Sequence, residues 1–278
     1  MSKFRFRTIY FLIFLGGLLW VTTAYGAPAA DLWPRWQKHD PDSLIVIDHS
    51  DWDFILQRYV KTSQPTGISR FQYSSVNEKD RKTLEGYLQA MQAVNVSSLK
   101  RSEQEAFWIN LYNGLTVKII LEHYPVKSIR DIDISPGIFS NGPWDAKLVK
   151  IEGQEISLND IEHRILRPIW QDNRIHYAVN CASLGCPDLQ PKAYTHQNLE
   201  QMLEKGARDY INHPRGVSFS GNRLIVSSIY FWFKADFGNS KKGIIQHLRK
   251  YLSPENLKML STMQNFKISH QYDWNLNE

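Results

Sequence analysis

The sequence predicts one α+β domain in which several helices surround a small, mostly antiparallel sheet. Segments with the 3.6-residue period of a helix occupy most of the chain, and most of the strand patterns occur as two hairpins. No linker and no internal repeat divides residues 50–278. With 42% apolar and 22% charged residues, the 278-residue chain has the composition of a folded globular protein.

The chain before Pro125 is predicted to be helical after an irregular lead-in over residues 27–49. Ser102 and Glu105 have the spacing of a capping box at the start of the longest helix, and Pro125 follows the end of that helix. The helices expected in this part cover residues 50–61, 77–94 and 103–123.

After Pro125 the predicted elements are shorter and mixed. Hairpins are expected over residues 147–156 and 217–226, and single strands over residues 175–180 and 266–272. The helices expected here cover residues 158–167, 196–211, 229–234, 242–252 and 254–263.

Residues 1–26 have the three parts of a secretory signal peptide. Lys3, Arg5 and Arg7 precede an apolar run over residues 9–20, and the small residues of Ala24-Tyr25-Gly26 precede a cleavage point before Ala27. An uncleaved membrane anchor is the alternative, since the apolar run is at the short edge of spanning length. We therefore expect a secreted, periplasmic protein that touches a membrane only through this segment if it is uncleaved.

The charge of the rest of the chain does not indicate a nucleic-acid partner. The three basic residues of the leader contribute +3 of the formal charge of +5, which leaves +2 for the remaining residues. So small a positive charge does not indicate binding to an anionic polymer.

The two cysteines, Cys181 and Cys186, have two interpretations. In an oxidising compartment they could form a disulfide, provided that a turn brings them together. Alternatively Cys181 is a nucleophile, because it follows an apolar strand and precedes small residues, where backbone N–H groups can lower a thiol pKa. Asn180 would then donate its amide to the oxyanion.

Two histidines could serve as the base for Cys181. Side chains alternate along a strand, so His176 and Cys181 would lie on opposite faces of the expected strand. His163, at the margin of an apolar helix face, is therefore the better candidate. Glu162 lies within that apolar face and must be paired, neutral or functional; as a structural residue it would pair with Arg167 or Arg208.

The helix over residues 103–123 is apolar on most sides, which predicts a buried central helix. Its polar residues therefore need partners. Glu105 is either half of the capping box or the carboxylate that orients the histidine. Asn110, Tyr112 and Asn113 either fix neighbouring loops or contact substrate.

Four stretches of the chain, residues 107–113, 157–167, 176–183 and 272–277, resemble the family described as domain of unknown function 547. The resemblance extends over about residues 50–277. It would suit a cysteine-peptidase-like or transglutaminase-like fold. In papain-like enzymes the nucleophile precedes the histidine, whereas here His163 precedes Cys181, which implies a rearranged topology, another histidine such as His270, or different chemistry.

The sequence therefore leads to two functional hypotheses. The first is a secreted thiol enzyme that acts on an amide, peptide or ester bond of a small-molecule, peptide or cell-envelope substrate. The second is a non-catalytic binding or scaffold domain that contains a disulfide between Cys181 and Cys186. A metal site formed by Cys181, Cys186, His163 and His176 is a third possibility, but we expect no metal and no cofactor. The expected catalytic residues are Cys181, His163, Glu105, Glu162 and Asn180, and the expected substrate-binding residues are Asn110, Tyr112, Asn113, His176 and Ser183.

Overall fold

The computed structural model describes residues 27–137 and 142–278. The predictions of a signal peptide or a membrane anchor fall on residues 1–26, outside this described part. None of the helices within residues 27–137 and 142–278 has the length and apolar character needed to cross a membrane.

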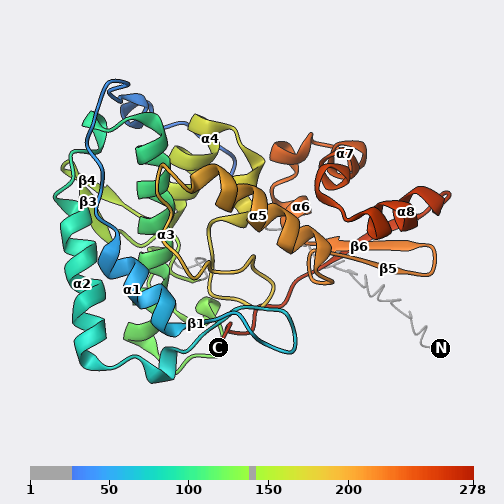
Figure 1. The fold of residues 1–278 in the computed structure, drawn as a ribbon, viewed down its shortest axis with the longest axis horizontal. Coiled ribbons are helices and arrows are strands. Elements are labelled where there is room, and N and C mark those ends of the chain that lie inside the picture. The colour runs from blue at the N-terminus through green and yellow to red at the C-terminus, as the bar shows by residue number, and fades with distance from the viewer. Residues whose placement is uncertain (1–26, 138–141) are drawn as a thin grey trace, which may run out of the picture.

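The predicted α+β class is confirmed, with the strands divided among three small sheets (Figure 1). The helices are α1 (Ser50–Tyr59), α2 (Glu78–Gln92), α3 (Arg101–His123), α4 (Arg167–Trp170), α5 (Leu199–Asn212), α6 (Ile229–Trp232), α7 (Lys241–Tyr251) and α8 (Pro254–Thr262). The strands are β1 (Val60–Lys61), β2 (Arg70–Phe71), β3 (Val149–Ile151), β4 (Gln154–Ile156), β5 (Val217–Ser220), β6 (Arg223–Ser227) and β7 (Lys267–Gln271). Pairing is antiparallel in β1–β2, β3–β4 and β5–β6, and parallel between β6 and β7.

Helix α3 is the centre of the larger of two apolar cores. Every residue from position 103 to position 117 is buried, as expected for a helix that is apolar on most sides. The predicted capping box is wrong, because α3 begins at Arg101 and its N-cap, Lys100, makes no side-chain cap. Ser102 therefore lies inside the first turn and cannot cap it.

The predicted helix after β4 is confirmed, but its form differs. A π-helix, η5 (Asp160–Leu166), continues directly into α4. Pro168 does not end the helix, because this residue lies within α4, directly after the π-helical turns. π-Helical turns are rare and occur often at functional sites.

The predicted strand over residues 175–180 is wrong. The structure has a 3-10 helix, η6 (Asn173–Tyr177), whose start is capped by Asp172. The segment is buried on all sides, and the N–H groups of Ala178 and Val179 bond to the carbonyl of Ile175 instead of a neighbouring strand. The strand alternation that would place His176 and Cys181 on opposite faces therefore does not apply.

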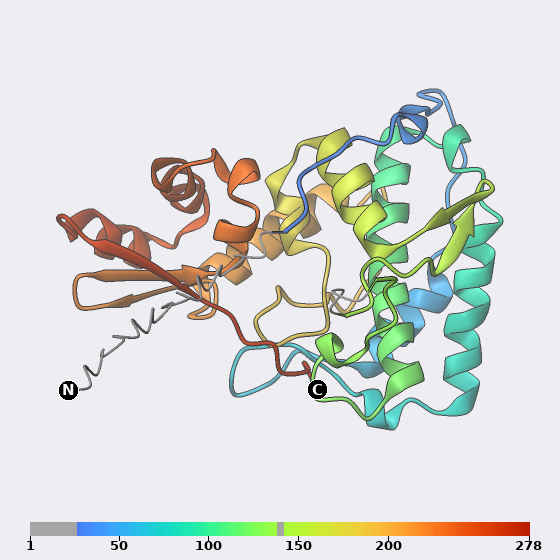
Figure 2. The ribbon, with the colours of Figure 1, turned by 180° about the vertical axis from the view of Figure 1, so that it is seen from behind.

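The C-terminal segment, residues 272–277, returns from β7 to the helical body (Figure 2). It pairs with residues 181–186, which we call the cysteine loop. The carbonyls of Asp273 and Asn275 accept hydrogen bonds from Gly185 and Leu184, each at 2.8 Å. The N–H of Asn277 donates to Ala182 at 3.1 Å. The conformation of the cysteine loop is thus fixed by residues about 90 positions away.

We predict that Gly185→Ala destabilises the protein by about 1–3 kcal/mol, as overpacking does in well-packed sites. A Cβ at position 185 would lie 2.8 Å from the backbone nitrogen of Asp273. Urea unfolding measures the change. Gly86→Ala in α2 is the control, since a Cβ there meets nothing within 4 Å and should stabilise the helix by about 0.5–1 kcal/mol. Equal stability of Gly185→Ala and the wild type would contradict the packing described here.

Candidate active site

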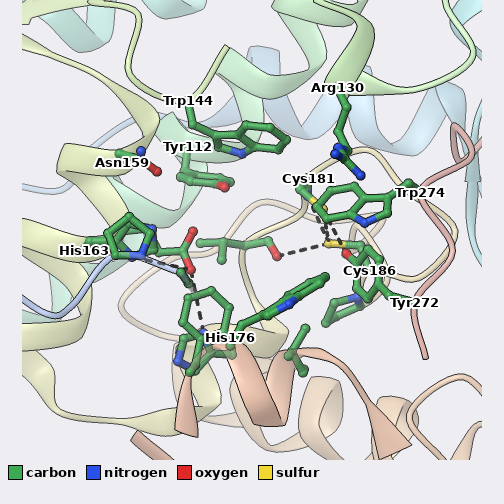
Figure 3. A pocket seen from close by; sticks show the side chains of 18 of the residues that line it. Tyr112, Arg130, Trp144, Asn159, His163, His176, Cys181, Cys186, Tyr272 and Trp274 are labelled. Atoms are coloured by element: carbon green, nitrogen blue, oxygen red, sulfur yellow. Dashed lines mark hydrogen bonds and ion pairs between the residues drawn. The ribbon is translucent and has the colours of Figure 1, made fainter. Parts of the chain in front are cut away.

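A cavity of about 610 Å³ lies where the larger helical body meets the C-terminal part of the chain. Helix α3 contributes Tyr112 to its lining, η5 contributes Glu162 and His163, and the cysteine loop contributes both thiols. Figure 3 shows the thiols and His163 on opposite sides of this cavity. The aromatic residues that line it are Tyr112, Trp144, Trp232, Phe233, Tyr272 and Trp274.

Cys181 lies at the wall of the cavity and both cysteines are free thiols. The Sγ of Cys181 is 3.1 Å from Cys186 Sγ, 3.2 Å from Ser183 Oγ and 3.1 Å from Tyr272 Oη. The hydrogen bond with the Cys186 thiol, aided by those of Ser183 and Tyr272, lowers the pKa of Cys181 to about 7 against the opposing effect of burial. Cys181 is therefore the thiolate of the pair.

The pKa of the Cys186 thiol is shifted in the opposite direction from that of Cys181. Burial raises the pKa of its thiol well above the ordinary value, and the neighbouring Cys181 adds to the rise. Its Sγ accepts a hydrogen bond from the backbone N–H of Cys181 at 3.0 Å. When Cys181 is ionised, the S–H of Cys186 is thus the donor between the two sulfurs.

The backbone beside Cys181 is strained. Ala182 has φ 56°, in the left-handed region that costs a residue with a side chain about 1–2 kcal/mol. Asn180 holds this turn, because its Oδ1 accepts from the N–H of Ala182 and its Nδ2 donates to the carbonyl of Pro187. The amide of Asn180 is therefore committed to the loop and does not line the cavity.

A partly buried ion pair between Arg167 and Asp236 orders the opposite side of the cavity. Arg167 donates to both carboxylate oxygens of Asp236, at 2.6 and 3.1 Å, and to the carbonyl of Pro28 at 2.7 Å. His176 Nε2 bonds to Asp236 Oδ2 at 2.7 Å. Asp236 accepts, so the proton of His176 is on Nε2 and its Nδ1 faces Glu162 Oε1 at 3.7 Å.

The tautomer of His163 follows from its contact with Arg167. Nη1 of Arg167 lies 3.0 Å from Nδ1 of His163, and a guanidinium can only donate, so the proton of His163 is on Nε2. Burial, together with the charge of Arg167, lowers the pKa of His163 to about 3. His163 is thus a neutral hydrogen-bond donor. Among the described residues, the Sγ of Cys181 bonds to Cys186, Ser183 and Tyr272 and to no histidine.

Glu162 is a buried carboxyl group in the lining of the cavity. Burial raises its pKa to about 7, despite the opposing charge of Arg167 and a hydrogen bond with Tyr112. The nearby Cys181 also raises this pKa, because two negative charges in one cavity repel each other. Near neutral pH, Glu162 can therefore both hold and release a proton.

The structure brings seven of the residues singled out from the sequence to the cavity or to the thiol of Cys181: Cys181, Cys186, Glu162, His163, Tyr112, His176 and Ser183. It does not bring Asn110 and Asn113 there. Their amides fix the backbone of Tyr194, and of Ala178 and Asn180, respectively. Glu105 also lies away from the cavity, and its buried Oε1 has no hydrogen-bond partner among the described residues. No group of three or more His, Cys, Asp or Glu side chains is arranged for a metal ion within the described ranges.

Asp236 and the thiol contact of Tyr272 were not identified from the sequence. Asp236 follows an aromatic run that reads as core, and no spacing relates it to His176, 60 residues earlier. Tyr272 lies in one of the four stretches that resemble the family, but only the fold shows its contact with Cys181, 91 residues earlier.

Comparison with known proteins identifies one family. Residues 96–211 match the family described as protein of unknown function, DUF547. This match covers 116 of the 278 residues of the chain. The DUF547 match includes Tyr112, η5 and the cysteine loop, whereas α6 and the C-terminal segment lie beyond it. Neither a curated protein nor a solved structure matches the chain.

We predict that Glu105→Gln stabilises the protein at pH 8. Burial raises the pKa of Glu105 from 4.5 to about 8, so the stability given by its neutral form is complete below pH 4.5 and is lost as the pH rises to 8. The Tm of the variant at pH 8 should exceed that of the wild type by about 2–4 °C or more, the shift that about 1 kcal/mol gives in a chain of this size. Thermal unfolding from pH 4.5 to 8 checks this. Glu155→Gln, at an exposed position of β4, is the control, and a constant difference at all pH values would contradict the assignment.

We also predict that Tyr272→Phe slows the alkylation of Cys181 at pH 7. Without the phenolic donor, the pKa of Cys181 should rise from about 7. A rise to about 8 would reduce the thiolate fraction at pH 7 about fivefold. The measurement is the rate of reaction with iodoacetamide against pH, with the labelled peptide identified by mass. Tyr230→Phe removes a hydroxyl that bonds to Tyr177, so its profile should match the wild type. An unchanged profile for Tyr272→Phe would show that the phenol does not support the thiolate.

Proposed function

We propose that the protein is a thiol-dependent enzyme that transfers or hydrolyses an acyl group, with Cys181 as the nucleophile. The observation that carries the proposal is the convergence of the Cys186 thiol and the Ser183 and Tyr272 hydroxyls on one sulfur at the wall of a cavity. Donors to a sulfur favour its thiolate, which is the reactive form. The aromatic lining gives the substrate a surface on which to pack near this sulfur.

In this proposal Glu162 moves the proton, rather than His163. The Cys181 thiolate attacks the carbonyl carbon of an amide, peptide or ester, and the carbon–sulfur bond forms. Neutral Glu162 protonates the leaving nitrogen or oxygen as its bond to carbon breaks. The resulting carboxylate then takes a proton from water, whose oxygen attacks the thioester and releases Cys181 as thiolate.

His163 has a different role here from the base expected on sequence grounds. Its Nδ1 lone pair is used by Arg167, and the neutral ring has a proton on Nε2. A neutral imidazole can polarise a carbonyl by donating to its oxygen. We therefore propose that His163 donates a hydrogen bond to the substrate from the side of the cavity opposite the thiols. Asn180 is not available for the oxyanion, because its amide donates to Pro187.

The proposed place of action rests on the leader pattern in residues 1–26. A basic start, an apolar run and a small-residue exit favour export, so we propose that the enzyme acts in the periplasm. A small molecule, a peptide or a cell-envelope component would then be the substrate.

The test uses p-nitrophenyl acetate as a generic acyl donor. Wild-type protein should release p-nitrophenol with a bell-shaped pH dependence centred near pH 7, because Cys181 must be ionised and Glu162 protonated. Glu162→Gln should reduce turnover by about 10²–10⁴-fold and accumulate an acetyl group on Cys181, detected by intact and peptide mass.

Cys181→Ala should abolish both release and acetylation, whereas Cys186→Ser should retain the acetylated peptide. Turnover by Cys181→Ala at the wild-type rate, or acetylation at another residue, would refute the proposal. The scaffold hypothesis makes the opposite prediction, namely a permanent disulfide between Cys181 and Cys186 and no reaction with the acyl donor.

A further inference from the structure

The acyl-transfer proposal leaves the second thiol without a reactive role. Cys186 is 5% exposed, and its Sγ lies 3.1 Å from that of Cys181. A serine at this position could donate the same kind of hydrogen bond to a thiolate, so donation alone does not require sulfur. Two sulfurs at this distance can also react with each other, provided that one of them is first oxidised.

We propose that Cys181 and Cys186 are a peroxide-reactive pair, in which Cys181 reduces a hydroperoxide and Cys186 resolves the product into a reversible disulfide. The inference goes beyond the proposed acyl transfer and does not depend on it. The ligand is a small hydroperoxide that enters the cavity, with hydrogen peroxide as the simplest member of the class.

The proposed reaction has two balanced steps. The Cys181 thiolate attacks the terminal oxygen of ROOH, the O–O bond breaks, and the alkoxide leaves as ROH after it takes a proton from solvent. The sulfenic sulfur of Cys181 is then attacked by Cys186, which loses its proton to the departing hydroxide. Two thiols and ROOH thus give one disulfide, ROH and water, and the hydroperoxide gains the two electrons that the sulfurs lose.

The geometry assigns different roles to the two thiols. Cys181 is the more exposed and lies in the cavity, where the hydroxyls of Ser183 and Tyr272 support its thiolate. Cys186 is buried behind it and remains protonated until a sulfenic acid forms next to it. To form a disulfide the sulfurs need to approach each other by about 1 Å, from 3.1 Å to bonding distance.

The cysteine loop does not need a permanent disulfide for its shape. Backbone hydrogen bonds join its residues 182, 184 and 185 to the C-terminal segment, and Asn180 braces Ala182. A disulfide that closes so short a loop also gives the least entropic stabilisation of the folded state. A reversible bond fits these contacts better than a structural one.

The test is the covalent state of the full protein after oxidation. Reduced wild-type protein treated with equimolar hydrogen peroxide should lose two hydrogens and gain no oxygen, by intact mass. Cys186→Ser should instead hold a sulfenic acid on Cys181 that dimedone traps, and should progress to sulfinic acid in excess peroxide. Cys181→Ser should oxidise at least about tenfold more slowly than wild type.

Further measurements guard against misfolded variants and a structural disulfide. Cys186→Ala repeats the experiment, and the Tm of each variant checks that it is folded. Identical products from wild type and both Cys186 variants would overturn the inference. So would a disulfide that dithiothreitol cannot reduce in the folded protein. A protein that forms the reversible disulfide but accepts no acetyl group would retain this inference and lose the acyl-transfer proposal, and the reverse result would do the opposite.

Discussion

The ion pair between the buried Arg167 and the partly buried Asp236 is the interaction on which the polar side of the cavity depends. It joins the end of the π-helix to the segment after α6, and so connects the two halves of the cavity wall. Each member also orders a histidine, since Arg167 donates to His163 and Asp236 accepts from His176. Loss of Asp236 would leave the buried guanidinium of Arg167 without its carboxylate partner and would release both rings at once.

The cavity contains two groups whose pKa values are shifted in opposite directions. Hydrogen-bond donors lower the pKa of Cys181, whereas burial raises the pKa of Glu162, and both reach about 7. The thiolate and the neutral carboxylic acid can therefore coexist near neutral pH, although each would be rare in water. Opposite shifts of neighbouring groups are a common arrangement in sites that use one nucleophile and one acid.

The parts of the fold that could be predicted from the sequence are those whose structure is local. The central helix, both hairpins and the helix that carries Glu162 follow from periodicity and turn residues. Residues 175–180 could not be predicted, because an apolar run has the same pattern whether it pairs with a strand or is buried in a turn capped by Asp172. The same limit applies to the site. Cys181, Glu162 and His163 stand out by their chemistry, but the contacts of Asp236 and Tyr272 depend on pairings 60 to 91 residues apart.

The pairing of the C-terminal segment with the cysteine loop has a consequence for how the protein folds. Tyr272 and the carbonyl of Asp273 reach the loop across about 90 residues, and contacts so distant in sequence are slow to form because a long loop must close first. Until they form, the Cys181 thiol lacks one of its hydroxyl donors, and the cysteine loop lacks its backbone hydrogen bonds to the C-terminal segment. The thiolate environment is therefore completed late in folding, so a nascent or partly folded chain carries a less reactive sulfur.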